Sequence, residues 1–164
     1  MNQKKITSVD TEHRHTFTGE FVRTGLKSFK KRGSRDKYSP TILFKNVKVD
    51  DNFLTNKVWL YYGKNFLKLG KLIKGDIIQF NGRIDTKSKG SNRKYDYKIE
   101  RPTKTKLVTS NHLYRKVPTT NRDIIGMILE DNQEFYYPAH RVTDNDLFYK
   151  QCYEVWKTNN RIIG

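Results

Sequence analysis

Cysteine and alanine are scarce in this sequence, and it contains no long apolar run. The single cysteine, Cys152, excludes an internal disulfide and every zinc motif that needs several cysteines. The single alanine, Ala139, disfavours a helical bundle, because alanine is the strongest helix former. Without a run of about 18 apolar residues, no membrane span is expected, and without an apolar stretch behind the basic start, no secretory signal is expected. The sequence therefore predicts a soluble, cytoplasmic protein.

Acidic residues are also few relative to basic ones. The 164 residues include 33 Lys and Arg but only 17 Asp and Glu, which gives a formal net charge of +16 at pH 7. Such an imbalance points to a polyanionic partner. The whole excess lies in residues 1–108, whereas residues 109–164 hold as many acids as bases. We therefore expect a flexible arm over 1–15, a basic domain over 16–108 and a neutral extension over 109–164.

Branched and aromatic residues are abundant in the basic domain, and such residues favour β-strands. Alternation of apolar and polar residues, bounded by turn-forming residues, predicts five strands, with Gly19 as a candidate bulge in the first. Long basic loops are predicted after the first and fourth strands, at 27–39 and 85–96. The five strands are placed at 17–26, 40–49, 57–62, 76–84 and 97–108.

The segment Leu69–Ile84, LGKLIKGDIIQFNGRI, combines a Lys-Gly-Asp turn with an alternating strand that ends in Gly and a basic residue. It resembles the stretch that enters the fourth strand in OB-fold nucleic-acid-binding proteins, and the resemblance covers about residues 16–108. It implies a five-stranded OB-fold barrel, in which strands two and three form the ligand face and two loops close over it. The expected fold class is therefore mainly β, with a C-terminal hairpin-plus-helix extension.

The third predicted strand carries the main candidates for base stacking. Lys57, Trp59 and Tyr61 point one way, and Val58 and Leu60 point the other. If the two aliphatic residues face inward, the two aromatic rings are exposed beside a lysine, which suits the stacking of unpaired bases. The alternative is a core tryptophan with Val58 exposed, since large aromatic residues are usually mostly buried.

The two basic loops and the neighbouring strands supply the other binding candidates. Cationic loops on both sides of one face would form a channel in which phosphates displace condensed counterions, although such loops are also compatible with plain solvated surface. Weaker aromatic candidates are Phe44, Phe29, Tyr38 and Tyr95, and Phe29 could equally anchor its loop. The basic candidates are Lys27, Lys30, Lys31, Arg32, Arg35, Lys37, Arg83, Lys87, Lys89, Arg93 and Lys94.

The neutral extension is predicted to form a hairpin over 123–131 and 134–142 and a helix over 146–157. The helix carries an amphipathic stripe at i, i+4, i+7 and i+8 spacing. This stripe either packs on the rest of the chain or docks a second protein, such as a polymerase or helicase, or a second copy of this chain. Its members are Phe148, Cys152, Val155 and Trp156.

No catalytic set emerges from the sequence. His13 and His15 form a His-x-His pair without further ligands at suitable spacing, and Asp50 and Asp51 are interpreted as a turn rather than a magnesium site. Neither a metal nor another cofactor is expected, and nuclease activity is the least favoured interpretation.

The leading hypothesis is a non-enzymatic protein that binds single-stranded DNA or RNA with little sequence preference, in replication, recombination or repair. DNA is favoured by analogy with basic standalone OB-fold proteins. One alternative is an accessory subunit of a replicative polymerase or helicase, which would contact its enzyme through the C-terminal extension. Another is a factor that binds structured RNA.

Overall fold

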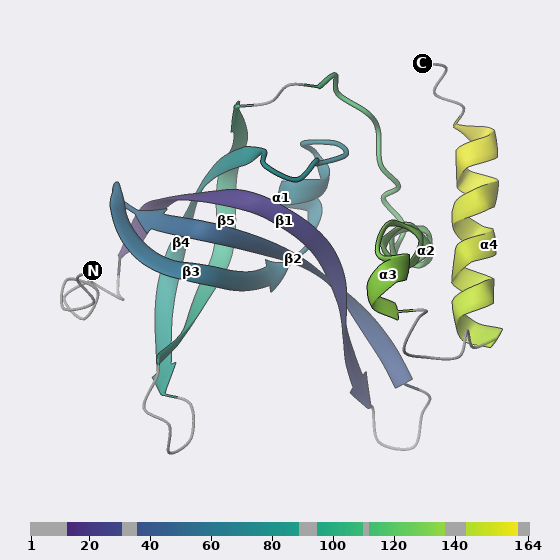
Figure 1. Cartoon of the computed structure of the whole chain (residues 1–164), viewed down its shortest axis with the longest axis horizontal. Helices are drawn as coiled ribbons and strands as arrows, with labels where there is room; N and C mark the ends of the chain where they lie inside the picture. The colour runs from purple at the N-terminus through teal and green to yellow at the C-terminus, as the bar shows by residue number, and fades with distance from the viewer. Residues whose placement is uncertain (1–12, 31–35, 89–94, 110–111, 137–143, 161–164) are drawn as a thin grey trace. The chain divides into compact units, whose positions relative to one another are not determined.

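The computed structural model describes residues 13–30, 36–88, 95–109, 112–136 and 144–160. Five antiparallel strands form one sheet in the order β3-β2-β1-β4-β5, so the mainly β class is confirmed. Among the described residues, no ladder joins β3 to β5. The strands are β1 (Arg14–Lys30), β2 (Asp36–Val49), β3 (Asn52–Tyr61), β4 (Ile77–Ser88) and β5 (Tyr95–Thr109) (Figure 1).

Helices follow β3 and β5 along the chain. The helices are α1 (Lys64–Leu67), α2 (Asn121–Asp131), α3 (Gln133–Tyr136) and α4 (Asp144–Asn159). None of the described helices is long and apolar enough to cross a bilayer.

Both predicted basic loops are strand at their two ends. The ladder between β4 and β5 continues as far as the pair Ser88 and Tyr95, and β1 and β2 extend to Lys30 and from Asp36. The loops were predicted from polar composition, whereas backbone hydrogen bonds extend a hairpin whatever the polarity of its side chains. Figure 1 shows β4 and β5 running side by side toward the end of the hairpin where Ser88 pairs with Tyr95.

Contacts between residues divide the chain into two compact units. The sheet unit contains residues 1–22, 43–60 and 72–113, and the helix unit contains the remaining segments, 23–42, 61–71 and 114–164. This division differs from the expected boundary at residue 109, because the distal parts of β1 and β2, together with α1, group with the C-terminal helices.

Three phenylalanines form the centre of the sheet unit. Phe17, Phe44 and Phe80 are fully buried, and the ring of Phe80 lies 5.5 Å from that of Phe17 and 5.7 Å from that of Phe44. Gly19 makes room for Phe44, since a Cβ at this position would lie 2.9 Å from the Cβ of Phe44. The bulge expected at Gly19 is absent from the ladder between β1 and β4, where Gly19 pairs with Ile78 without a register shift.

A bulge occurs on β2 instead. Phe44 and Val47 are both fully buried although they lie three positions apart, which a regular strand does not allow. Asn46, between them, has a φ of 50°. An extra residue in β2 therefore returns Val47 to the core.

The turn interpretation of Asp50 and Asp51 is confirmed. The two residues join β2 to β3 with φ values of 48° and 68°, as a two-residue hairpin turn requires. The carboxylate of Asp50 accepts hydrogen bonds from the Thr16 backbone N–H at 3.2 Å and lies 2.9 Å from Nδ1 of His15. This turn is thereby fixed to the start of β1.

The predicted hairpin in the neutral extension is wrong. Its first strand is α2, and residues 134–136 belong to α3, while 137–143 lie outside the described residues. Residues 124–129 are all buried, so α2 lacks the polar face that identifies a helix in a sequence. Thr120 donates a hydrogen bond to Asp123 in the first turn, where a carboxylate also favours the helix dipole.

The predicted C-terminal helix is confirmed as α4, and it packs closely on α2. A Cβ on Gly126 would lie 2.0 Å from the carbonyl oxygen of Tyr149, so only glycine permits this approach. Tyr153 is buried at the same contact. Its burial, and to a smaller extent the negative charge of Asp131, raises the pKa of its hydroxyl group to about 12. Lys157 lies 4.8 Å from the Tyr153 ring centre and pairs with Glu130.

Gly126→Ala should destabilise the helix unit by about 1 to 3 kcal/mol, because the added methyl group meets backbone that cannot move aside. Chemical denaturation measures this loss. Gln151→Ala is the control, since this exposed position of α4 already carries a Cβ and alanine there should change the free energy of unfolding by about 0.5 kcal/mol or less. A Gly126→Ala variant as stable as the wild type would contradict the close helix contact.

Candidate nucleic-acid interface

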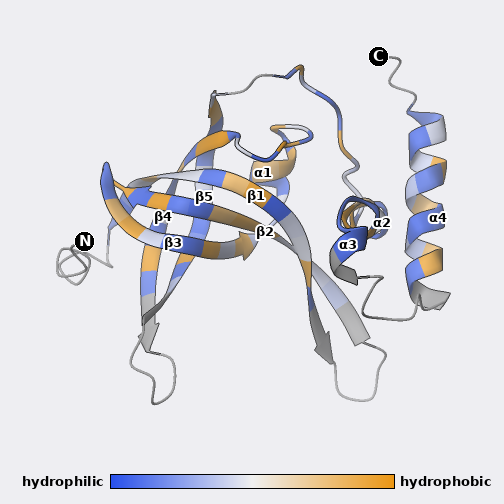
Figure 2. Ribbon diagram, in the orientation of Figure 1, coloured by the Kyte–Doolittle hydropathy of each residue, from blue (hydrophilic) through white to orange (hydrophobic). Residues whose placement is uncertain are grey.

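Strand β3 exposes the rings that its alternation predicts. Val58 and Leu60 are each 4% exposed, whereas Trp59 is 38% exposed and Tyr61 is 62% exposed. Lys57 is exposed on the same side of the strand. The core interpretation of Trp59 is therefore wrong. Figure 2 shows the resulting change between apolar and polar residues along the strands.

Strand β4 contributes polar and basic groups to the outer side of the sheet. Ile78 and Phe80 are fully buried, so the alternation of the strand sets Arg83 on the outer side, where it is exposed. Gln79 lies on the same outer side and is half-buried. Arg83 faces Arg14 across the β1 ladder, so two guanidinium groups stand at neighbouring outer positions.

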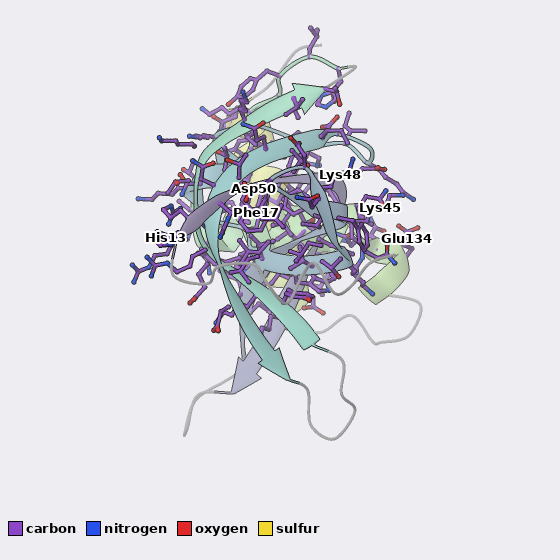
Figure 3. All side chains as sticks on the ribbon, turned by 90° about the vertical axis from the view of Figure 1, so that its left-hand side faces the viewer. His13, Phe17, Lys45, Lys48, Asp50 and Glu134 are labelled. Atoms are coloured by element: carbon purple, nitrogen blue, oxygen red, sulfur yellow. The ribbon has the colours of Figure 1, made fainter. Side chains whose placement is uncertain are left out.

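Three basic residues of this surface were missed by the sequence analysis. Lys45 is half-buried and Lys48 is exposed on β2 (Figure 3). Arg14 is exposed on β1. Lys48 lies between the buried Val47 and Val49, and therefore points outward. The alternation of β2 indicates the place of Lys48 once the bulge at Asn46 is recognised.

Two acidic groups on this side of the sheet unit, Glu20 and Asp50, are engaged by neighbouring residues. Glu20 pairs with Lys45 at 3.4 Å and accepts a hydrogen bond from Asn46 at 3.4 Å. Asp50 is held by His15 and by the Thr16 backbone. We name the outer surface of β1 to β4 in the sheet unit, with its basic residues Arg14, Lys45, Lys48, Lys57 and Arg83 and the Trp59 ring, the basic face.

Two of the weaker aromatic candidates have structural positions. Phe44 was expected to stack on bases, and this prediction is wrong because the ring is fully buried between Gly19 and Phe80. Tyr38 is half-buried in the helix unit, where its ring lies 6.2 Å from that of Tyr149. Its hydroxyl is 3.5 Å from the carboxylate of Asp146, so we assign Tyr38 to packing.

For most candidates from the hairpin ends, the structure describes no side chain. Lys27 is exposed on β1. Five candidates have a described backbone within strands and no described side chain: Phe29, Lys30, Lys37, Lys87 and Tyr95. Six candidates lie outside the described residues: Lys31, Arg32, Arg35, Lys89, Arg93 and Lys94.

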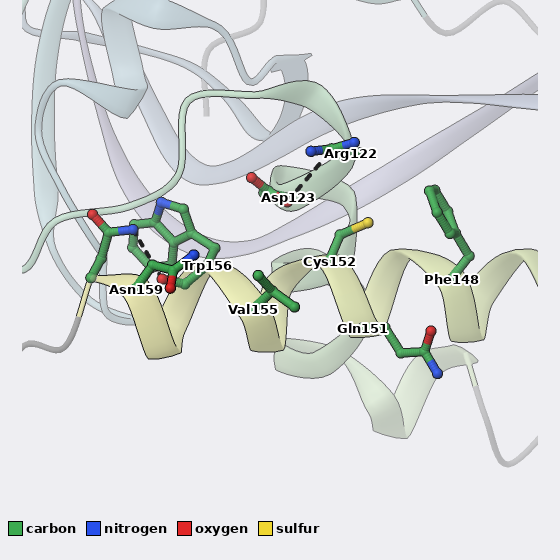
Figure 4. Close-up of a pocket in the computed structure, with 9 residues that line it drawn as sticks. Arg122, Asp123, Phe148, Gln151, Cys152, Val155, Trp156 and Asn159 are labelled. Carbon is green, nitrogen blue, oxygen red and sulfur yellow. Dashed lines mark hydrogen bonds and ion pairs between the residues drawn. The ribbon is translucent and has the colours of Figure 1, made fainter.

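The stripe of α4 faces a hollow in the helix unit. Phe148 and Val155 are 51% and 59% exposed, while Tyr153, which lies outside the stripe, makes the buried contact with α2. The hollow has a volume of about 330 Å³ and is also lined by Cys152 and Trp156. Figure 4 shows the stripe beside Arg122 and Asp123 from the start of α2.

The described residues contain no group of three or more side chains that could hold a metal ion. His15 is occupied with Asp50, and His112 lies 2.7 Å from the buried carboxylate of Asp76, which also accepts a hydrogen bond from the Ile73 backbone. These two histidines therefore have structural partners within the sheet unit.

Comparison with protein-family models, curated proteins and solved structures found no match to this chain. The functional proposal therefore depends on the chemistry of its own residues.

The alternation of β3 predicts losses of stability of different size for two adjacent substitutions. Leu60→Ala should lower the free energy of unfolding by about 2 to 5 kcal/mol, because it opens a cavity in the core. Trp59→Ala should lower it by about 1 kcal/mol or less, as is usual for a partly exposed position. Denaturant titration of both variants compares them, and a larger loss for Trp59→Ala would place the indole in the core.

Proposed function

We propose that this protein binds single-stranded nucleic acid, with little sequence preference, through the basic face. The observation that carries the proposal is strand β3, which buries Val58 and Leu60 and leaves Trp59 and Tyr61 exposed beside Lys57. Exposed rings offer flat surfaces to bases, and every base has a face on which to stack. Such contacts need no base-edge reading, which accounts for the low sequence preference.

Electrostatic attraction supplies the second part of the proposal. The chain carries a net charge of +16, and the acids Glu20 and Asp50 near the basic face are already engaged within the protein. Lysine and arginine side chains that neutralise phosphates release condensed counterions, and this release favours binding at low salt. Stacking then distinguishes unpaired strands from duplex, whose bases are not available to a ring.

The strand order supports the OB-fold as part of this proposal. A sheet with β1 at its centre and β3 and β5 at its ends is compatible with the partly open, five-stranded barrel of that fold. Proteins of the OB-fold bind nucleic acid over strands two and three, where Lys57, Trp59 and Lys48 lie here. DNA is the favoured ligand by the same analogy, and a role in replication, recombination or repair belongs to this proposal.

Titration with oligo(dT) tests the proposal directly. The chain has two tryptophans, so Trp156→Phe leaves Trp59 as the single indole. Oligo(dT) should quench its fluorescence, and the slope of log affinity against log salt should be about −0.7 for each phosphate contacted. Trp59→Ala, measured by anisotropy of a labelled oligonucleotide, should weaken binding by about 1 to 3 kcal/mol.

Matched oligo(U) and duplex DNA complete this experiment. Binding to oligo(dT) and oligo(U) in excess of duplex supports a site for unpaired strands, and the ratio of the two affinities decides between DNA and RNA. Tight binding only to duplex or to folded RNA would refute the proposal.

A second candidate function is that of an accessory subunit, which would bind a replicative polymerase or helicase through α4. The observation that favours it is the exposure of Phe148 and Val155, because helix packing inside the protein is already provided by Tyr153 and Gly126.

This second candidate predicts that the stripe is dispensable for folding. Phe148→Ser combined with Val155→Ser should leave the melting temperature and the oligo(dT) affinity almost unchanged. Tyr153→Ala should lower the melting temperature, because that ring is buried between the helices. Equal destabilisation by the double variant would show that the stripe serves internal packing, and would remove this candidate.

A further inference from the structure

Strand β5 presents a row of cations beside the basic face. Its exposed basic residues are Lys98, Arg101, Lys104 and Lys106. Within the described part of the chain, no ion pair or hydrogen bond engages these four side chains, whereas Lys45, Lys71 and Lys157 each pair with a carboxylate. The charge of this strand is therefore not used to hold the fold together.

Two of the three irregularities in the β4–β5 ladder decide which way Arg101 and Lys104 point. Gln79 pairs with Lys106, Asn81 with Thr103, and Arg83 with Glu100. Between consecutive pairs the chain advances by two residues on β4 but by three residues on β5. Each step therefore contains one extra β5 residue, which defines a β-bulge. Arg101 and Lys104, one at each bulge, both have a φ of 51°.

Without the bulges, Arg101 would face the core. Ile99 is buried, and in a regular strand Arg101 would share its face. The first bulge exposes Arg101 but reverses the alternation, which would then direct Lys104 inward. The second bulge exposes Lys104 and returns Thr105, which is buried, to the inner side. Each bulge thus keeps one cation on the outside.

The backbone at these positions is strained, and the structure holds it in place. A left-handed φ suits glycine and is unfavourable for arginine and lysine. Nη2 of Arg14 donates hydrogen bonds to the carbonyl oxygens of Arg101 and Asn81 and to the hydroxyl of Thr103, at 2.5, 3.2 and 2.9 Å. Strain that is fixed in this way is typical of functional positions.

We infer that β5 is a second phosphate-binding line, on which Arg101 and Lys104 contact the backbone of the nucleic acid strand bound by the basic face. The inference rests on the proposed function. β5 pairs with β4, so its cations continue the surface that carries Arg83 and Gln79. Protection of an exposed sheet edge also uses bulges and lysines, but that role alone predicts an unchanged salt dependence of oligo(dT) binding when the two charges are removed.

The double variant Arg101→Gly/Lys104→Gly separates these two roles. Glycine relieves the left-handed strain and keeps the bulges, so the melting temperature should stay the same or rise. Loss of two phosphate contacts should reduce the magnitude of the salt slope for oligo(dT) by about 1.4, at 0.7 for each contact. Quenching of Trp59 at saturation, measured in the Trp156→Phe background, should be retained.

Lys64→Gln/Lys68→Gln is the matched control, because it removes the same charge from exposed positions at α1. A control with a wild-type salt slope beside a reduced slope for the glycine variant supports the inference. The inference is overturned if the salt slope of the glycine variant equals that of the control variant, or if it equals that of a wild-type protein that binds oligo(dT). In either case the proposed function is unaffected. Failure of the wild-type protein to bind oligo(dT) overturns both the inference and the proposed function.

If the glycine variant is less stable than the wild type, Arg101→Asn/Lys104→Asn repeats the test, since asparagine tolerates this φ.

Discussion

A β-strand directs only every second side chain into a core, and the sheet unit depends on this constraint. Its interior is a small cluster of rings around Phe17, Phe44 and Phe80. A cation directed into such an interior without a partner would be strongly destabilising. The strands keep their alternation where the sequence permits it, and bulges correct it elsewhere, at Asn46, Arg101 and Lys104, each with a left-handed backbone.

The same constraint gathers the functional groups on one surface. Once the aliphatic residues of β3 face inward, Trp59 must face outward beside Lys57, and on β4 the burial of Phe80 sets Arg83 on the outer side. Rings and cations then lie on the same side of the sheet unit. The combination suits a flexible polyanion with unpaired bases, because phosphates and bases need contacts of different chemical kinds.

Alternation allowed the sequence to predict the five strands and the exposure of Trp59 and Tyr61. It did not predict the burial of Phe44, because the bulge at Asn46 changes which residues of β2 face inward. Helix α2 was mistaken for a strand, since a helix buried on all sides shows a short apolar run without helical periodicity. Arg101 of β5 was missed for a related reason: its exposure follows from a ladder shift that the sequence of one strand does not reveal.

Amide NMR titration of the isotopically labelled protein with oligo(dT) tests the central claim most directly. The account predicts that the largest shift changes fall on the Trp59 indole N–H and on the outward residues of β3 and β4, including Lys57 and Arg83. Amides of α4 should change little. Shift changes confined to the α4 hollow, or an unperturbed Trp59 indole at saturating oligonucleotide, would contradict a stacking surface on this sheet.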